Sequence, residues 1–193
     1  MPYTPQNYDS LLGTPGFSET LLKNHFTLYQ GYVTNTNKLA DTLATLARDG
    51  KTATPEYAEI KRRFGWEFNG MRLHELYFGN MKSGGQPLDS SSTVNQLLAS
   101  EFGGFDSWLA DFKASGTMRG IGWTVLYHDR DAKRLFNTWV NEHDVGHLTG
   151  CTPLLVLDVF EHAYMLDYGL KRADYIEAFI KAIDWNIVTR RLL

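Results

Sequence analysis

The sequence predicts an α+β fold. An N-terminal antiparallel helical hairpin is expected to precede an α/β domain, in which helices flank a three-stranded antiparallel sheet. Two long stretches with helical periodicity come first, and three short apolar runs follow in the second half. A Gly- and Pro-containing segment at 83–87 separates the two regions. We therefore expect a helical hairpin domain over 1–86 and an α/β domain over 87–193.

The first half of the chain predicts the hairpin. Ser18 can cap a helix over about 19–48, in which apolar and aromatic residues recur at helical spacing until Asp49 and Gly50 end the pattern. Pro55 can open a second helix over about 56–82. Two long helices joined by a short polar connection are typical of an antiparallel pair.

The second half predicts the sheet and its flanking helices. Helical patterns cover 92–102 and 105–115, and β-rich runs at 122–128 and 134–140 flank a polar turn. A third strand is expected at 152–157, and one final helix starts near 173 and includes Ile183. The topology is then two helices, a pair of shorter helices, three strands and a last helix.

Composition excludes several classes of protein. The chain has 193 residues, 43% of them hydrophobic and 21% charged, with a net charge of −3, so nothing indicates nucleic-acid binding. No apolar run approaches the roughly 20 residues that cross a bilayer, and no signal peptide is visible. Cys151 is the single cysteine, which excludes an intrachain disulfide. We expect a cytoplasmic protein without nucleic-acid or membrane partners.

Four residues form a candidate metal site. Asp158 ends the third strand, and His162 follows four residues later. A buried carboxylate is costly unless it is paired. Alone, this pair is explained by hydrogen bonds in a core, and His25 and His74 by ordinary burial in their helices. Together, three imidazoles and one carboxylate predict an open mononuclear site that zinc, iron or manganese can occupy.

The chain resembles one known family along nearly its whole length. Residues 158–164 read Asp-Val-Phe-Glu-His-Ala-Tyr, which is similar to the D-x-[WF]-E-H-A-Y signature of the iron/manganese superoxide dismutases. The other matching segments are 32–39 after His25, 68–70, 74–78, 120–123, 166–168, 171–175 and 184–186. A chance D-x-x-x-H would not bring these matches with it.

The resemblance implies a redox site and an activity. His25, His74, Asp158 and His162 would hold one iron or manganese ion per subunit, with water or hydroxide as a fifth ligand. Superoxide would be the substrate, disproportionated to dioxygen and hydrogen peroxide. The choice between iron and manganese stays undecided.

The resemblance also implies roles around the ligands. Tyr32 matches the family's gateway tyrosine, which can relay protons to the bound solvent. His143 stands where most members have a glutamine, which resembles the archaeal-type branch, and we expect it to contact that solvent. His147 is expected to be structural or exposed. The rings expected to wall the site are Trp123, Phe160, Tyr77 and Trp185.

Assembly is the next implication. In the family the glutamate of the signature crosses a two-fold interface, so Glu161 would meet His162 of the partner subunit. Tyr164 lacks the histidine that its counterpart usually meets. We expect a homodimer, with a homotetramer as the larger alternative.

One spacing departs from the family. Tyr32 follows His25 by seven residues, one fewer than usual, and the intervening double histidine is absent. An extra helical residue is commonly absorbed as a π-bulge, so the shorter spacing predicts unbroken α-helical bonding here.

Two other functions stay open. A non-dismutating homologue could bind metal without turnover. A zinc hydrolase could use the same His3Asp set to activate water, although the sequence offers no obvious general base beside it.

Overall fold

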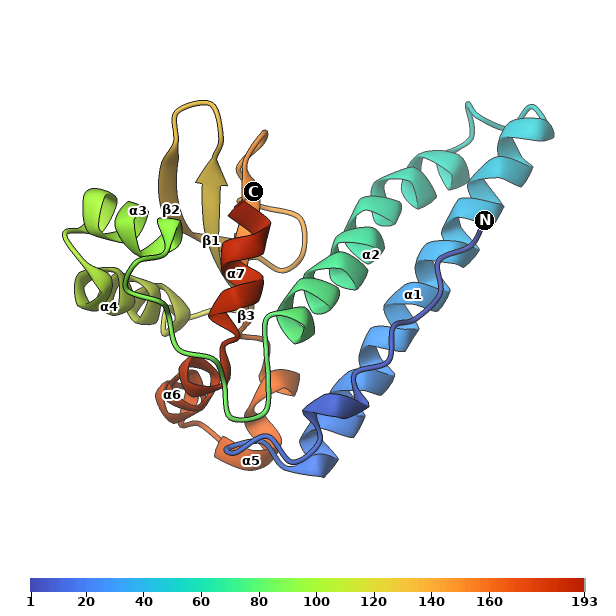
Figure 1. The fold of residues 1–193 in the computed structure, drawn as a ribbon. Coiled ribbons are helices and arrows are strands. Elements are labelled where there is room, and N and C mark those ends of the chain that lie inside the picture. Colours follow the sequence, from blue (N-terminus) through green and yellow to red (C-terminus); the bar gives the residue numbers. More distant parts are fainter. Residues whose placement is uncertain (193) are drawn as a thin grey trace.

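The computed structural model describes residues 1–192 and has the expected α+β architecture (Figure 1). The helices are α1 (Glu19–Arg48), α2 (Pro55–Gly79), α3 (Thr93–Phe102), α4 (Phe105–Gly116), α5 (Met165–Tyr168), α6 (Arg172–Ala182) and α7 (Trp185–Leu192). The strands are β1 (Gly122–Asp129), β2 (Arg134–Asn141) and β3 (Thr152–Asp158). Two 3-10 turns, η1 (Asp9–Leu11) and η2 (Glu161–Ala163), complete the chain.

The helical hairpin starts where the capping residues predict. The Ser18 side chain accepts a hydrogen bond from the amide of Leu21 at 3.0 Å, and Thr54 does the same for Tyr57 at 3.2 Å. In Figure 1, α1 and α2 run side by side away from the rest of the molecule. Every residue of α1 is α-helical, including those between His25 and Tyr32, which confirms the prediction of an unbroken helix there.

The sheet has the order β2-β1-β3, and both pairings are antiparallel. The central strand β1 is buried along almost its whole length. Figure 1 shows the hairpin on one side of the sheet and α3 and α4 on the other, with α7 lying along β3. Because β1 pairs Trp123 with Asp158, the end of β3 lies at the start of β1, close to the helical hairpin.

The last predicted helix is two helices in the structure. Ile183 has extended dihedral angles, and it forms an isolated bridge with Met81 just after α2. The Asp184 amide donates to the Asn80 carbonyl at 2.9 Å. These long-range hydrogen bonds interrupt a stretch whose local sequence reads as helix. They also fasten the end of α2 to the connection between α6 and α7.

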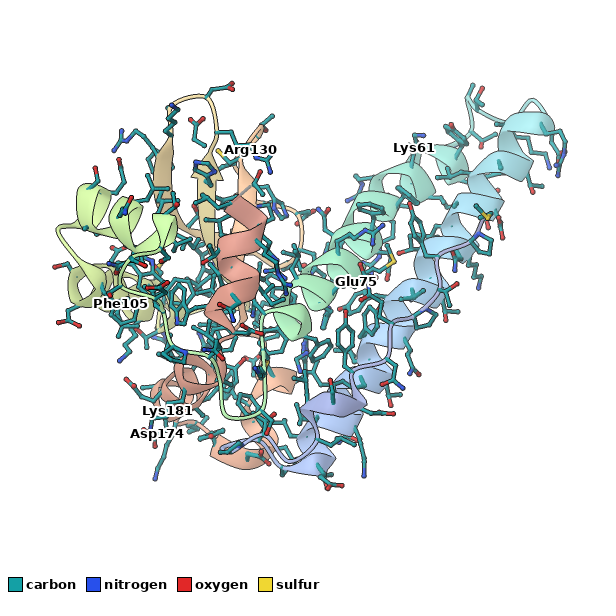
Figure 2. The ribbon with its side chains drawn as sticks, in the orientation of Figure 1. Lys61, Glu75, Phe105, Arg130, Asp174 and Lys181 are labelled. Atoms are coloured by element: carbon teal, nitrogen blue, oxygen red, sulfur yellow. The ribbon has the colours of Figure 1, made fainter. Side chains whose placement is uncertain are left out.

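Side chains fill the space between the hairpin and the sheet (Figure 2). Glu75, labelled there, accepts a hydrogen bond from the Tyr29 hydroxyl at 3.0 Å and so links α2 to α1. Arg130 lies at the tip of the β1–β2 hairpin, and Asp174 and Lys181 lie on α6. Within residues 1–192, no helix has both the length and the apolarity that crossing a membrane requires.

Candidate metal centre

Four side chains from four different elements meet between the hairpin and the sheet. His25 comes from α1, His74 from α2, Asp158 from the end of β3 and His162 from η2. One ligand atom from each lies within 4.8 Å of the others. The side chains of the first three are at most 1% exposed, whereas that of His162 is 27% exposed. The cluster is therefore sealed on three sides and open beside His162.

All three imidazoles present the same nitrogen to one carboxylate oxygen. The Nε2 atoms of His25 and His162 lie 3.2 and 3.1 Å from Asp158 Oδ2. The Nε2 atom of His74 lies 3.6 Å from the same oxygen, beyond hydrogen-bond distance. The other carboxylate oxygen, Oδ1, accepts from the Phe160 amide at 2.9 Å. This amide fixes the carboxylate so that Oδ2 faces the three rings.

The His74 ring indicates that the cluster is built for a cation. Its Nδ1 lies 2.6 Å from the Gly70 carbonyl oxygen, which can only accept, so Nδ1 carries the proton. Nε2 then presents a lone pair, and it is buried with no hydrogen-bond partner in residues 1–192. A buried lone pair beside a carboxylate oxygen is unfavourable unless a cation lies between them. Three nitrogens and one oxygen suit iron, manganese or zinc.

Burial sets the protonation of this cluster. It lowers the pKa of His25 and of His74, so both rings are neutral at pH 7. Burial alone would raise the pKa of Asp158, but the adjacent His162 and His25 rings outweigh it and lower the pKa. Neutral imidazoles and an ionised carboxylate are the forms that bind a metal ion.

A hydrogen-bonded chain of three side chains lies beside the four-residue cluster. The Trp123 indole Nε1 donates to His143 Nδ1 at 3.0 Å, and His143 Nε2 lies 2.8 Å from the Tyr32 hydroxyl. Since Nδ1 accepts, the neutral ring carries its proton on Nε2 and donates it to Tyr32. The Tyr32 hydroxyl hydrogen is then left to donate elsewhere.

His143 is held neutral by its surroundings. It is fully buried, and burial lowers its pKa to about 4. Both ring nitrogens already have protein partners, which the sequence did not indicate. A contact between His143 and metal-bound solvent would share the Nε2 hydrogen with Tyr32. Burial, followed by the charges of Asp158 and Glu67, raises the pKa of Tyr32, so its hydroxyl keeps its proton.

Aromatic rings enclose the ligands, and three of the four expected ones contribute. Trp123 lies edge-on to His74 with ring centroids 5.0 Å apart, and Tyr77 lies 5.3 Å from the His25 ring. Phe160 stacks on His162 at 5.2 Å. The prediction for Trp185 was wrong. Its ring packs against Phe105 and Trp108 of α4. In Figure 1, α4 lies on the side of the sheet away from the helical hairpin.

Two supporting residues were missed from the sequence. The Tyr175 hydroxyl donates to the Asp158 carbonyl at 2.7 Å and accepts from Tyr77 at 3.0 Å, so it fixes the backbone that carries the carboxylate. Gly70 accepts from His74 and also lies against Tyr32. A glycine inside a helical pattern was the signal for Gly70, because it costs helix stability unless packing requires it.

Glu161 and Tyr164 flank His162 in the sequence and differ in burial. Glu161 is exposed and lines a cavity of about 470 Å³ with His162 and Leu166. Tyr164 is buried, stacks on Tyr175 and accepts a hydrogen bond from Arg172 Nε at 3.2 Å. Arg172 is thus a partner of the Tyr164 hydroxyl within the same chain.

The fold and the four-residue cluster define a class of metalloprotein with a mononuclear His3Asp centre between a helical hairpin and a small sheet. The model of the C-terminal domain of iron/manganese superoxide dismutases matches residues 90–191. The chain therefore belongs to the iron/manganese superoxide dismutase family.

Curated relatives match both halves of the chain. Superoxide dismutase [Fe] of Aquifex pyrophilus is 36% identical over 192 residues, which cover 97% of this chain and 86% of the relative. Superoxide dismutase [Mn] 2 of Haloferax volcanii is 35% identical over 183 residues, with 94% and 89% covered. Superoxide dismutase [Fe] of Sulfolobus acidocaldarius is 32% identical over 198 residues, with 99% and 92% covered. Iron and manganese enzymes thus match equally well.

Proposed function

We propose that this protein is a superoxide dismutase that holds one iron or manganese ion in His25, His74, Asp158 and His162. The observation that carries the proposal is the convergence of three imidazole Nε2 atoms on Asp158 Oδ2, with the His74 nitrogen otherwise unpartnered. Membership of the family gives this arrangement its chemistry.

When held by these residues, iron or manganese would supply one-electron redox chemistry between the +3 and +2 states, which converts one superoxide to dioxygen and, with two protons, another to hydrogen peroxide. The protein's own residues orient the ligands. Gly70 keeps the His74 proton on Nδ1, and Tyr175 holds the Asp158 carbonyl. Such outer hydrogen bonds fix the tautomer and direction of each ligand.

Tyr32 is the residue best suited to deliver protons to the reacting oxygen. Its hydroxyl receives a hydrogen bond from His143 and has its own hydrogen free to donate. It also lines a surface pocket of about 260 Å³ together with Arg63, Trp66 and Glu67. Trp123 and Phe160 exclude bulk water from the cluster, so that protons arrive through the Tyr32 hydroxyl.

We also propose a homodimer formed across the open side of the cluster. His162 is partly exposed there, and Met165 and Leu166 are 46% and 57% exposed beside it. The Glu161 carboxylate has no hydrogen-bond partner within residues 1–192, so it is available to His162 of the partner subunit. Sedimentation should find two chains per particle, or four if dimers pair, and Glu161→Ala should shift it toward monomer. A wild-type monomer at micromolar concentration would contradict the dimer.

The division into domains at 1–86 and 87–193 is part of the same proposal, with the metal between them. Two ligands precede residue 86 and two follow it. Gly84 and Gly85 both have positive φ in the connection between α2 and α3, which supports a turn at the boundary. Limited proteolysis at 83–87 that leaves two folded fragments would support this boundary.

We also propose a cytoplasmic location. The single cysteine, Cys151, suits a reducing compartment, where disulfides are rare. Cell fractionation of the native host would test it.

The proposal is tested by metal analysis together with a superoxide-consumption assay. Wild-type protein should bind one iron or manganese ion per chain and consume superoxide. His74→Gln should lose both properties, whereas His128→Gln is the matched control, because His128 is also buried but lies outside the ligand cluster. Zinc occupancy without superoxide consumption would favour a hydrolase. An iron- or manganese-loaded protein without turnover would favour a metal-binding homologue.

A further inference from the structure

The position of His143 depends on a loop with little regular structure. Residues 142–151 join β2 to β3, and Glu142 and Gly146 both have positive φ, 48° and 106°. A Cβ at Gly146 would lie 2.4 Å from the Trp139 carbonyl oxygen, so the loop passes very close to β2. The backbone bonds that hold the loop near His143 belong to Asn141, Glu142 and Val145.

The His143 backbone itself is held by a side chain. Within residues 1–192, its carbonyl oxygen accepts from no backbone amide, and its hydrogen bond is with His147 Nε2 at 2.9 Å. The other ring nitrogen of His147, Nδ1, lies 2.8 Å from the Tyr127 hydroxyl. A carbonyl can only accept, so Nε2 carries the proton and Nδ1 accepts from Tyr127. A neutral His147 ring satisfies both contacts.

Two parallel contacts therefore connect β1 to this loop. Trp123 donates to His143, and Tyr127 donates to His147. The donors are four residues apart on a strand, which places them on the same face of the sheet, and the two histidines are also four residues apart. Tyr127 is 3% exposed and belongs to the central strand, so it is a rigid anchor.

We propose that His147 is a positioning residue for His143. With Tyr127 it fixes the His143 carbonyl, and thereby keeps the His143 ring aligned between Trp123 and Tyr32. Without this contact the loop would move the ring relative to the Tyr32 hydroxyl. Misplacement of a catalytic group by about 1 Å can lower a rate by about 100-fold. The expected loss of rate rests on the proposed dismutase function, whereas the expected movement of the His143 ring does not.

The structural consequence can be measured without turnover. The chain has five tryptophans, so the indole N–H region of a ¹H–¹⁵N spectrum is simple, and Trp123→Phe assigns the Trp123 signal. In full-length protein loaded with diamagnetic zinc, this signal reports the hydrogen bond to His143. His147→Ala and Tyr127→Phe should both shift it. Val145→Ala is the matched control in the same loop, because Val145 is 62% exposed and takes no part in the contact.

A conservative variant separates positioning from general stability. His147→Gln keeps an N–H donor for the His143 carbonyl and should return the Trp123 signal toward its wild-type position. In iron- or manganese-loaded protein, kcat should fall by about 10- to 100-fold in His147→Ala and recover in His147→Gln.

The inference is overturned if His147→Ala leaves the Trp123 signal where Val145→Ala does, or if His147→Gln shifts it as far as His147→Ala. A shifted signal in a protein that never consumes superoxide would reject the proposed function and keep the positioning role. If His147→Ala does not fold, Tyr127→Phe and His147→Gln decide the same question.

Discussion

Gly70 is the position where one added methyl group should separate activity from stability. A Cβ built there lies 2.6 and 2.7 Å from two carbon atoms of the Tyr32 ring. An ordinary van der Waals contact of a Cβ is at least 3.4 Å long. In Gly70→Ala the ring must therefore retreat by about 0.8 Å, which would lengthen its 2.8 Å contact with His143. The Gly70 carbonyl, which fixes His74, is retained.

The expected magnitudes follow from this displacement. A shift near 1 Å at the proton donor should lower kcat by about 10- to 100-fold. Overpacking costs about 1–3 kcal/mol. Removing a helical glycine returns about 0.5–1 kcal/mol, so the free energy of unfolding should fall by no more than about 2.5 kcal/mol. Metal content should stay at the wild-type level.

The control is in the same helix. At Gly65 a Cβ meets nothing within 4 Å, so Gly65→Ala should keep full activity and gain about 0.5–1 kcal/mol of stability. Urea unfolding and superoxide consumption should be measured on both variants at equal metal content. If Gly70→Ala were as active as Gly65→Ala, the reasoning that Tyr32 needs its present position would be refuted.

Three further predictions concern stability, each measured by urea unfolding. Arg191→Met should cost about 1–3 kcal/mol, because the partly buried guanidinium donates to the Leu154 carbonyl at 2.8 Å and the variant removes this donor. The other two acceptors, Asn80 Oδ1 and the Leu76 carbonyl, keep the amides of Val156 and Asn80 as donors. A cost below about 0.5 kcal/mol would contradict this. Burial lowers the pKa of His143 to about 4, so the stability that its neutral ring contributes is complete above pH 6.5 and is lost as the pH falls toward 4. In His143→Gln, the loss of unfolding free energy between pH 6.5 and 4 should therefore be smaller by about 3 kcal/mol. An unchanged pH dependence would argue against a buried neutral ring. Ser18→Ala should cost about 1 kcal/mol through the α1 cap, and no loss would remove the cap from the account.

The sequence predicted the local elements well, because their signals are local. Ser18 and Pro55 mark helix starts, and the strands are apolar runs between turn residues. The break between α6 and α7 was missed because it depends on Ile183 pairing with Met81, a contact across the fold. The wrong expectation for Trp185 has the same origin, since that break sends its ring to the other side of the sheet.

The four residues of the candidate metal site were brought together by residue type and by family resemblance, and not by spacing. His25 and Asp158 are 133 residues apart, and periodicity alone explains each as an ordinary core residue. The hydrogen bonds that support His143 were harder to predict from the sequence. His147 was expected to be structural or exposed, because its bonds to His143 and Tyr127 depend on how an irregular loop lies against β1. Such contacts leave no pattern in a single sequence.

The central claim is that these four ligands hold a redox metal that consumes superoxide. The most direct test is to remove all metal, reload separate samples with iron, manganese and zinc to one ion per chain, and measure superoxide consumption in each. The account predicts consumption with iron or manganese, none with zinc, and none in Asp158→Asn with any metal. Stoichiometric binding of iron and manganese without consumption in either sample would contradict it.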